Sequence, residues 1–473
     1  MMNDPKALAT TWPPRIIIAA PQGHSGKTVI SIGLCASLKQ RGLVVQPFKK
    51  GPDYIDPSWL AAAGGRDCHN LDPLLMPEQS LLASFERACQ GADLALIEGS
   101  MGLYDSLDTT GQGSTARVAR LLQSPVILIV NSARMTNSIA AMVLGYQHFD
   151  TETNIAAVIL NNVSGSRHEQ KLTAAVKQHC GIPVVGSVPR DATLNIAERH
   201  LGLIPYREAG DWSAIERIGN CLKNNLNLEA ILAVARNAGG GSPVNVSFPK
   251  RKKTVVRIGV MLDHIFTFYY PENLGALIQA GAELVFINSV HDSRLPDIDG
   301  LYIGGGFPEL YLSELEANTS LRQHIARAIN NGLPVYAECA GLMYLCRGIR
   351  WHSRWHEMVG VIPANVEIGQ KPKGHGYVSA EVTQENPWLP VGLKFWGHEF
   401  HYSKMAISGE LNFAYQIRRG YGIDGRKDGV IYKNMLGAYT HLHSLGVPQW
   451  ADALVSLALQ ERKGHRSLSV LTH

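Results

Sequence analysis

Cys339 is a candidate nucleophile because of the residues on either side of it. The apolar run Leu333–Ala337 predicts a strand that leads into it, and Ala340 and Gly341 begin a helix-forming stretch after it. A sharp strand-to-helix turn with small residues lifts a nucleophile clear of a sheet, and a helix start favours the thiolate of a cysteine. A lone cysteine is more often a buried structural residue, so the interpretation depends on its neighbours.

A glycine run and a late histidine support this interpretation. Gly304–Glu309 follow a second short strand, Asp299–Ile303, and could supply a backbone N–H that faces the sulfur. A thiolate beside such an oxyanion hole performs acyl transfer. His441 follows a strand-like stretch near the C-terminus and is the candidate general base, while His443 is a weaker candidate for the same role.

A second set of residues predicts a phosphate-binding loop. Gln22–Thr28 lie between the first apolar strand and a helix and end in the Gly-Lys-Thr of a P-loop, with Pro21 in place of the motif's first glycine. In such a loop the backbone N–H groups hold phosphates, the lysine reaches the β- and γ-phosphates, and the threonine hydroxyl binds magnesium. The candidate nucleotide-binding residues are Gly23, Ser25, Gly26, Lys27 and Thr28, and Thr28 is also a candidate metal ligand.

Polar residues at the ends of two further strands should lie near this loop. The apolar run 93–97 ends at Glu98, a candidate magnesium ligand at the carboxyl edge of the sheet, where ligands bind. The segment Phe48–Pro57 also follows a strand and should point into the same crevice. Either segment alone could be a solvated turn, but their position beside one phosphate loop favours a site. The charged residues of the second segment are Lys49, Lys50, Asp53 and Asp56.

The composition is that of an ordinary globular protein. The 473 residues, 45% hydrophobic and 18% charged, are enough for two or three cores. The net charge of +4 is spread along the chain, which argues against a nucleic-acid binder. Seven widely spaced cysteines without a CxxC pair argue against a disulfide framework or zinc site and fit a reducing cytoplasm. We find no apolar run long enough to span a membrane and no signal-peptide core near Met1.

Alternating strand and helix patterns predict two α/β domains in tandem. Runs rich in Ile and Val alternate with helical stretches up to about residue 205, which predicts a parallel, doubly wound sheet. The segment 236–254 begins with a stretch that has neither period and predicts a linker. A second α/β series follows, so we expect domains at 1–235 and 255–473. The predicted strands are 15–20, 43–48, 94–97, 126–130, 156–160 and 184–188, then 255–261, 282–287, 301–303 and 334–337.

Taken together, these segments resemble the cobyrinic acid a,c-diamide synthase family over essentially the whole chain. Besides the phosphate loop, eight ordered motifs carry the resemblance. They are Phe48–Pro57, Asn70–Asp72, Ile97–Asp105, Glu198–Leu203, Phe268–Leu274, Gly304–Tyr311, Tyr336–Tyr344 and Gly397–Ser403. So many matches in the same order are not expected by chance.

The resemblance implies an N-terminal P-loop amidoligase domain of the dethiobiotin-synthetase type and a C-terminal class I glutamine amidotransferase domain. Such enzymes use ATP and Mg²⁺ to phosphorylate an acetate side chain of a tetrapyrrole, and ammonia from L-glutamine then displaces the phosphate. By the same resemblance, Cys339 would attack glutamine and His441 would protonate the departing ammonia. The implied oxyanion donors are the N–H groups of Ala340 and of Gly305 or Gly306. The residues implied around the nucleotide and the substrate carboxylate are Lys49, Asp53, Tyr54, Asp56 and Asp105.

Three departures from the family pattern leave parts of this interpretation open. Class I amidotransferases usually carry a glutamate two residues after the histidine, and His443 stands there instead. Cobyrinate enzymes usually carry arginine at the position of Trp396, and Lys373–Val378 looks more like relatives that amidate siroheme or nickel-sirohydrochlorin. The expected substrate is therefore cobyrinate or a sirohydrochlorin-type macrocycle.

A rival from another class is a nucleotide-switched partitioning ATPase fused to an inactive glutaminase-like domain. The presence of Cys339 disfavours it. We expect ATP, L-glutamine and a tetrapyrrole carboxylate as partners, no nucleic acid or membrane, and a cytoplasmic location. A homodimer is left open.

Overall fold

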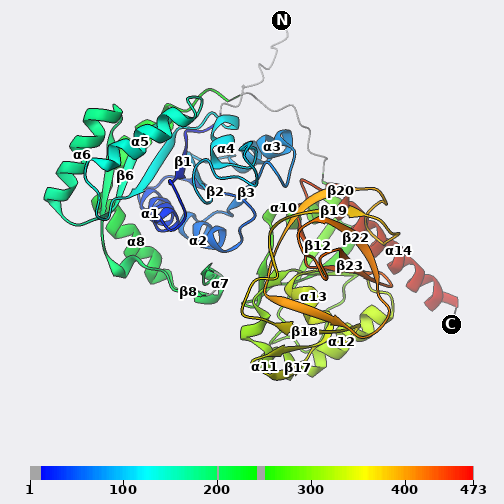
Figure 1. Ribbon diagram of the computed structural model, residues 1–473. Coiled ribbons are helices and arrows are strands. Elements are labelled where there is room, and N and C mark those ends of the chain that lie inside the picture. The colour runs from blue at the N-terminus through cyan, green and yellow to red at the C-terminus, as the bar shows by residue number, and fades with distance from the viewer. Residues whose placement is uncertain (1–11, 200–201, 242–250, 472–473) are drawn as a thin grey trace, which may run out of the picture. The chain divides into compact units, whose positions relative to one another are not determined.

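The chain forms two compact units, residues 1–247 and 248–473 (Figure 1). The computed structural model describes residues 12–199, 202–241 and 251–471. The expected linker at 236–254 and the motif at 198–203 lie partly outside the described residues, and the N-terminal start around Met1 lies wholly outside them. The predicted domain bounds stay a prediction.

The first unit is built on one sheet in which every strand pair is parallel. Its strands are β1 (Arg15–Ala19), β2 (Val45–Lys50), β3 (His69–Leu71), β4 (Leu94–Glu98), β5 (Val126–Asn131), β6 (Ile155–Val163) and β7 (Val184–Pro189). Their order is β3-β2-β4-β1-β5-β6-β7. The central strands β1 and β4 are buried along their whole length, which explains their continuous apolar sequences. The predicted doubly wound parallel sheet is confirmed, and only the short β3 has no predicted counterpart.

Helices cover both faces of this sheet (Figure 1). One face carries α1 (Lys27–Gln40), α2 (Ile55–Gly64) and α8 (Trp212–Asn225), and the other carries α3 (Glu78–Ala88), α4 (Thr115–Leu121), α5 (Ser138–Phe149) and α6 (Ser166–Cys180). Helix α1 packs closely on α8. Gly33 allows this approach, because a Cβ atom at its position would lie only 2.2 Å from Leu222 Cδ1. The remaining elements are β8 (Glu198–Arg199), β9 (Gly202–Leu203), α7 (Tyr206–Ala209) and α9 (Leu228–Arg236).

The second unit has a larger sheet that is parallel in one half and antiparallel in the other. In spatial order its strands are β12 (Ala282–Ile287), β10 (Val256–Met261), β13 (Gly300–Ile303), β15 (Val335–Glu338), β24 (Met435–Ala438), β23 (Lys427–Tyr432), β22 (Asn412–Arg419), β19 (Gly374–Val382), β20 (Lys394–His401) and β25 (His441–Leu442). The pairs from β12 to β24 are parallel and those from β24 to β25 are antiparallel. The predicted strands of the second series are β10, β12, β13 and β15.

Two smaller sheets, five α-helices and a short 3-10 helix (Pro308–Leu310) complete the described part of the second unit. One sheet pairs β11 (Phe266–Phe268) with β14 (Gly305–Gly306). The other has four strands in the order β17 (Arg354–Glu357), β16 (Cys346–Trp351), β18 (Ile362–Ile368) and β21 (Ser403–Ile407). The helices are α10 (Pro271–Ala280), α11 (Leu312–Ala317), α12 (Thr319–Asn330), α13 (Ala340–Leu345) and α14 (Gln449–Leu471). No helix in the described parts of either unit is long and apolar enough to cross a membrane.

Candidate active site

The predicted phosphate loop connects β1 to the start of α1. Gly26, the residue before α1, has a left-handed backbone with a φ of 95°. A Cβ atom at this position would lie 2.3 Å from Asn161 Nδ2, and the same amide donates a hydrogen bond to the Ser25 carbonyl at 2.9 Å. Because glycine has no side chain to cap the helix, the first N–H groups of α1 stay available for an anion.

Lys27 is held by backbone carbonyls of two loops. Its Nζ donates to the Met101 carbonyl at 2.7 Å and to the Gln22 carbonyl at 3.2 Å. Burial, helped by the nearby charge of Lys49, lowers the pKa of Lys27 to about 8. A phosphate group would offer this buried cation a negative partner that carbonyls do not provide.

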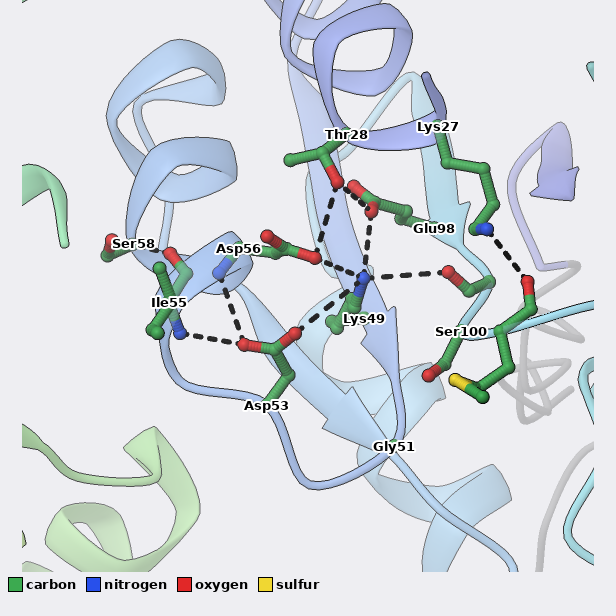
Figure 2. Close-up of polar contacts among 12 residues, drawn as sticks. Lys27, Thr28, Lys49, Gly51, Asp53, Ile55, Asp56, Ser58, Glu98 and Ser100 are labelled. Carbon is green, nitrogen blue, oxygen red and sulfur yellow. Dashed lines mark hydrogen bonds and ion pairs between the residues drawn. The ribbon is translucent and has the colours of Figure 1, made fainter. Parts of the chain in front are cut away.

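Five residues from three segments meet around the Lys49 ammonium (Figure 2). Lys49 Nζ lies 2.5 Å from Asp56 Oδ2, 2.8 Å from Glu98 Oε1 and 3.8 Å from Asp53 Oδ2. Thr28 Oγ1 lies 2.8 Å from the same Glu98 oxygen and 3.3 Å from Asp56 Oδ2. The sequence predicted that these segments would lie beside one phosphate loop, and the structure brings the five side chains together. We name Thr28, Lys49, Asp53, Asp56 and Glu98 the acidic cluster.

The pKa values in the acidic cluster follow from burial and from the one ammonium. Burial alone would lower the pKa of Lys49, but the charges of Asp56, Glu98 and Asp53 raise it well above its usual value. Burial raises the pKa of Glu98, and burial together with the charge of Asp56 raises that of Asp53 to about 7. Burial opposes ionisation of Asp56 as well, yet Lys49 holds the pKa of Asp56 below its usual value. Lys49 therefore remains charged, and Asp56 ionises at a lower pH than Asp53.

The loop that carries Asp53 is fixed by local hydrogen bonds. Asp53 Oδ1 accepts the N–H groups of Ile55 at 2.8 Å and Asp56 at 3.2 Å, which starts α2. Asn70 Nδ2 donates to the carbonyls of Gly51 and Asp53 at 2.7 and 2.8 Å. These bonds set the directions of the two aspartates toward Lys49.

Three further charged or polar candidate residues are not part of the acidic cluster. Tyr54 precedes α2. Asp105 is exposed, and its Oδ2 accepts the Gly102 N–H at 2.8 Å, although its charge still acts on Lys27. The expectation that Lys50 points into the crevice is wrong: successive strand side chains point to opposite faces, and the charge that acts most on Lys50 is that of Asp72.

Cys339 occupies the turn between β15 and α13, as the sequence predicted. Its φ of 48° and ψ of −100° lie outside the usual regions for a residue with a side chain, which is the strained turn of a nucleophile elbow. Gly341 is needed two residues after it, because a Cβ atom there would lie 2.4 Å from the Ile303 carbonyl oxygen. Cys339 is 5% exposed, so its sulfur is nearly enclosed.

The Cys339 thiol is protonated at rest. Burial raises its pKa, the charge of Glu309 adds to this, and the N–H of Ala340 acts in the opposite direction. The start of α13 favours the thiolate, as the sequence predicted, but burial has the larger effect and raises the pKa overall. A general base is needed to remove the proton during attack.

His441 lies against the glycine segment that precedes Cys339 in the sequence. A Cβ atom at Gly305 would lie 2.5 Å from His441 Cε1 and 3.3 Å from its Nε2. Gly305 and Gly306 form β14, whose pairing with β11 holds them extended. The His441 ring also stacks on His398, with centroids 4.8 Å apart and planes at 21°.

His443 has a structural place in the loop after β25. It is fully buried, its Nδ1 accepts the Leu445 N–H at 3.2 Å, and its Nε2 lies 3.6 Å from Glu272 Oε2. With one nitrogen accepting from the backbone and the other facing an acid, His443 stabilises the loop. These contacts do not favour its use as the base.

Sequence reasoning missed three residues that contact the predicted groups. Asn161 contacts the phosphate loop, His398 stacks on His441, and Glu338 directly precedes Cys339. A signal for Glu338 was present, since it ends an apolar strand as Glu98 does. His398 lies in Gly397–Ser403, one of the segments that carry the family resemblance, but it was not predicted to be a site residue.

Comparisons with known proteins agree with both halves of this description. A CobQ/CobB/MinD/ParA nucleotide binding domain matches residues 16–204, and a CobB/CobQ-like glutamine amidotransferase domain matches residues 257–448. A nucleotide-binding unit and a glutamine amidotransferase unit on one chain define a glutamine-hydrolysing ligase.

Curated relatives narrow this class. The cobyrinate a,c-diamide synthase of Magnetococcus marinus is 43% identical to this chain. The matched region covers 93% of this chain and 96% of that protein. Two further proteins of the same name are each 41% identical to this chain. The one from Methanosarcina acetivorans matches 94% of this chain and 95% of its own length, and the one from Archaeoglobus fulgidus matches 95% and 98%. The chain belongs to the cobyrinate a,c-diamide synthase family.

Proposed function

We infer that this chain uses ATP to amidate the a and c acetate carboxylates of a tetrapyrrole, with ammonia taken from glutamine. The observation that supports this most is the presence of two chemical centres on one chain. The first unit has a phosphate loop beside the acidic cluster. The second has a strained cysteine at the end of β15, and the neighbouring strand β24 leads to His441. The names of the relatives suggest cobyrinate as the macrocycle.

The first unit would activate the carboxylate. A carboxylate resists attack by ammonia, whereas an acyl phosphate has an electrophilic carbonyl and a good leaving group. An oxygen of the substrate carboxylate would attack the γ-phosphorus of ATP and release ADP, and ammonia would then displace phosphate. Lys27, once released from the Met101 carbonyl, would neutralise charge that builds on the transferred group.

A magnesium ion would supply further charge neutralisation between ATP phosphates and protein. The donors present fit this ion, since Thr28 Oγ1 and the carboxylates of Glu98 and Asp56 are oxygen ligands close together. The described residues contain no group of three or more His, Cys, Asp or Glu side chains arranged as a metal cage. Magnesium usually takes one or two carboxylates and completes its shell with phosphates and water.

The second unit would release ammonia. His441 would take the proton of Cys339 as the sulfur attacks the amide carbon of glutamine, and the C–N bond would break as His441 returns the proton to ammonia. Water would then hydrolyse the thioester to glutamate. The Ala340 N–H, together with that of Gly305 or Gly306, is the proposed oxyanion hole.

A sirohydrochlorin-type macrocycle is the second candidate substrate. The sequence departures that favour it, Trp396 and Lys373–Val378, lie on the paired strands β20 and β19, where Trp396 faces Ser379. These strands belong to the amidotransferase unit, so they do not by themselves define a macrocycle site. The relatives' names therefore make cobyrinate the first choice.

Product analysis tests the proposal. The protein would be incubated with ATP, magnesium and glutamine, and with cobyrinate, siroheme or nickel-sirohydrochlorin in separate reactions. Mass spectrometry should detect two carboxyl-to-amide conversions on one of these macrocycles, with cobyrinate expected. Glutamine hydrolysis without amidation of any of the three would contradict the proposal.

A further inference from the structure

The glutamate that usually orients the histidine of a class I amidotransferase is absent from the sequence position where it is expected. His443 stands there, and its two nitrogens face the Leu445 N–H and Glu272. A general base that must collect a proton from Cys339 needs a fixed tautomer, in which Nδ1 carries the hydrogen and Nε2 is free to accept.

We propose that Glu338, the residue directly before the nucleophile, is the positioning residue that orients His441. Glu338 Oε2 lies 3.5 Å from His441 Nδ1, and the side chains are fully buried and 2% exposed respectively. This separation is slightly long for a hydrogen bond, as is common in enzymes without substrate. The inference rests on the glutaminase role proposed for Cys339 and His441.

Glu338 is held in place by three hydrogen-bond donors. The Tyr302 hydroxyl donates to its Oε2 at 2.9 Å, and the Tyr336 hydroxyl donates to its Oε1 at 3.0 Å. The backbone N–H of Leu442 donates to Oε1 at 3.1 Å, directly after His441 in the chain. These donors satisfy the hydrogen-bonding capacity of the buried carboxyl oxygens. Its orientation is therefore set before any substrate arrives.

The two ring nitrogens of His441 point to different partners. Nδ1 faces Glu338, while Nε2 lies on the side of Gly305, next to the proposed oxyanion segment. A carboxylate at Nδ1 holds the hydrogen there and leaves the Nε2 lone pair for the cysteine proton. It would also stabilise the imidazolium that forms during attack.

The strand geometry explains how an acid next to the nucleophile can reach the base. Cys339 turns out of the strand at a positive φ, whereas Glu338 is still the last residue of β15. Strand β24, which leads to His441 through Tyr439 and Thr440, pairs in parallel with β15, with Glu338 opposite Ala438. The nucleophile, its base and the acid thus come from neighbouring strand ends.

The principal test is the glutaminase rate of Glu338→Gln in the full chain. The change keeps the size of the side chain and removes its charge. We expect kcat for glutamine hydrolysis to fall by roughly 10²–10⁴-fold, with KM for glutamine changed much less. Replacing the acid that orients the histidine of a catalytic triad has an effect of this kind. Ammonia-supported amidation, which does not use this centre, should be retained and reports an intact fold.

Glu316→Gln is the matched control. Glu316 also faces a histidine, with Oε2 at 2.9 Å from His356 Nδ1, and it lies in the same unit on α11. We expect its glutaminase kcat to match that of the wild type. An equal fall in both variants would show a general effect of losing a carboxylate and would overturn the proposal.

A measurement on the unaltered chain does not depend on how the variants fold. Nitrogen NMR of histidine-labelled protein, with the His441 signal assigned through His441→Gln, should show a neutral ring protonated at Nδ1. A ring protonated at Nε2, or wild-type kcat in Glu338→Gln, would overturn the role of Glu338 while leaving the glutaminase intact. Absence of Cys339-dependent glutamine hydrolysis in the wild type would overturn the proposed function as well.

Discussion

The Lys49 ammonium lies 2.8 Å from Glu98 Oε1, and these two residues are also directly paired on the neighbouring strands β2 and β4. Parallel strands place their carboxyl ends at one edge of a sheet, so a cation at the end of one strand meets an anion at the end of the next. Thr28 Oγ1 contacts the same Glu98 oxygen, so this pair brings the phosphate loop and the acids together. Four predictions follow from this arrangement and from the cysteine elbow.

Replacing Lys49 with methionine should destabilise the first unit. The change leaves Asp53, Asp56 and Glu98 buried without their shared cation, which typically costs about 3–5 kcal/mol. Without the ammonium the carboxylates have raised pKa values and take up protons as the pH falls, so the loss should be smaller at low pH. Urea unfolding of both proteins at acidic and at mildly alkaline pH measures this difference.

The exposed pair of Arg41 and Glu229, 2.7 Å apart, supplies the control. Arg41→Ala should change the free energy of unfolding by less than about 1 kcal/mol. If Lys49→Met were no more harmful than this surface change, or equally harmful at both pH values, the electrostatic account of the cluster would be wrong.

ATP affinity should fall as the pH rises above about 8. Burial lowers the pKa of Lys27 to about 8, so the free protein loses this positive charge in that range, and binding then requires uptake of a proton. Affinity should decrease by roughly tenfold per pH unit above the pKa. Titration calorimetry in buffers of different ionisation enthalpy detects the proton directly.

The variant Lys27→Arg distinguishes the loss of charge on Lys27 from other effects of pH on ATP binding. A guanidinium stays protonated throughout this range, so any binding by the variant should not require proton uptake above pH 8. Proton uptake that persists unchanged in this variant would assign the titration to another group.

Gly26→Ala should destabilise the phosphate loop in the absence of ATP. The left-handed backbone costs a residue with a Cβ atom about 1–2 kcal/mol, and the new atom would lie 2.3 Å from Asn161 Nδ2. Gly23→Ala is the control in the same loop, since a Cβ atom there meets nothing within 4 Å. Equal melting temperatures for the two variants would contradict the close approach.

Cys339→Ala should abolish glutamine-supported amidation and retain ammonia-supported amidation. The first unit does not use the thiol, so external ammonia can replace the missing supply. Cys346→Ala removes another buried cysteine of the same unit, 0% exposed, and should keep glutamine-supported activity in the folded protein. Loss of ammonia-supported activity in folded Cys339→Ala would count against two separate centres.

Most of the first unit could be predicted because its strands are buried on both faces. Strands such as β1 and β5 are continuous apolar runs, which single sequences show clearly. The three-residue β3 is too short to give a pattern. Lys49 and Lys50 could not be told apart by sequence position alone, because the register of the strand decides which one enters the crevice.

The second unit could be predicted only in its parallel half. Strands β16 to β23 contain alternating or irregular burial, as in β18, so they give no continuous run to recognise. The nucleophile and the late histidine were found from local motifs. Glu338 was not, because its contact with His441 depends on pairing between β15 and β24, which are far apart in the sequence.

The most direct test of the two-centre account follows the nitrogen atom. Wild-type protein, ATP, magnesium and cobyrinate would be incubated with glutamine that carries the heavy nitrogen isotope in its side-chain amide. We expect the label in both new amides by mass spectrometry, and no labelled product with Cys339→Ala. Labelled ammonia without any labelled macrocycle, or equal labelling by Cys339→Ala, would contradict the account.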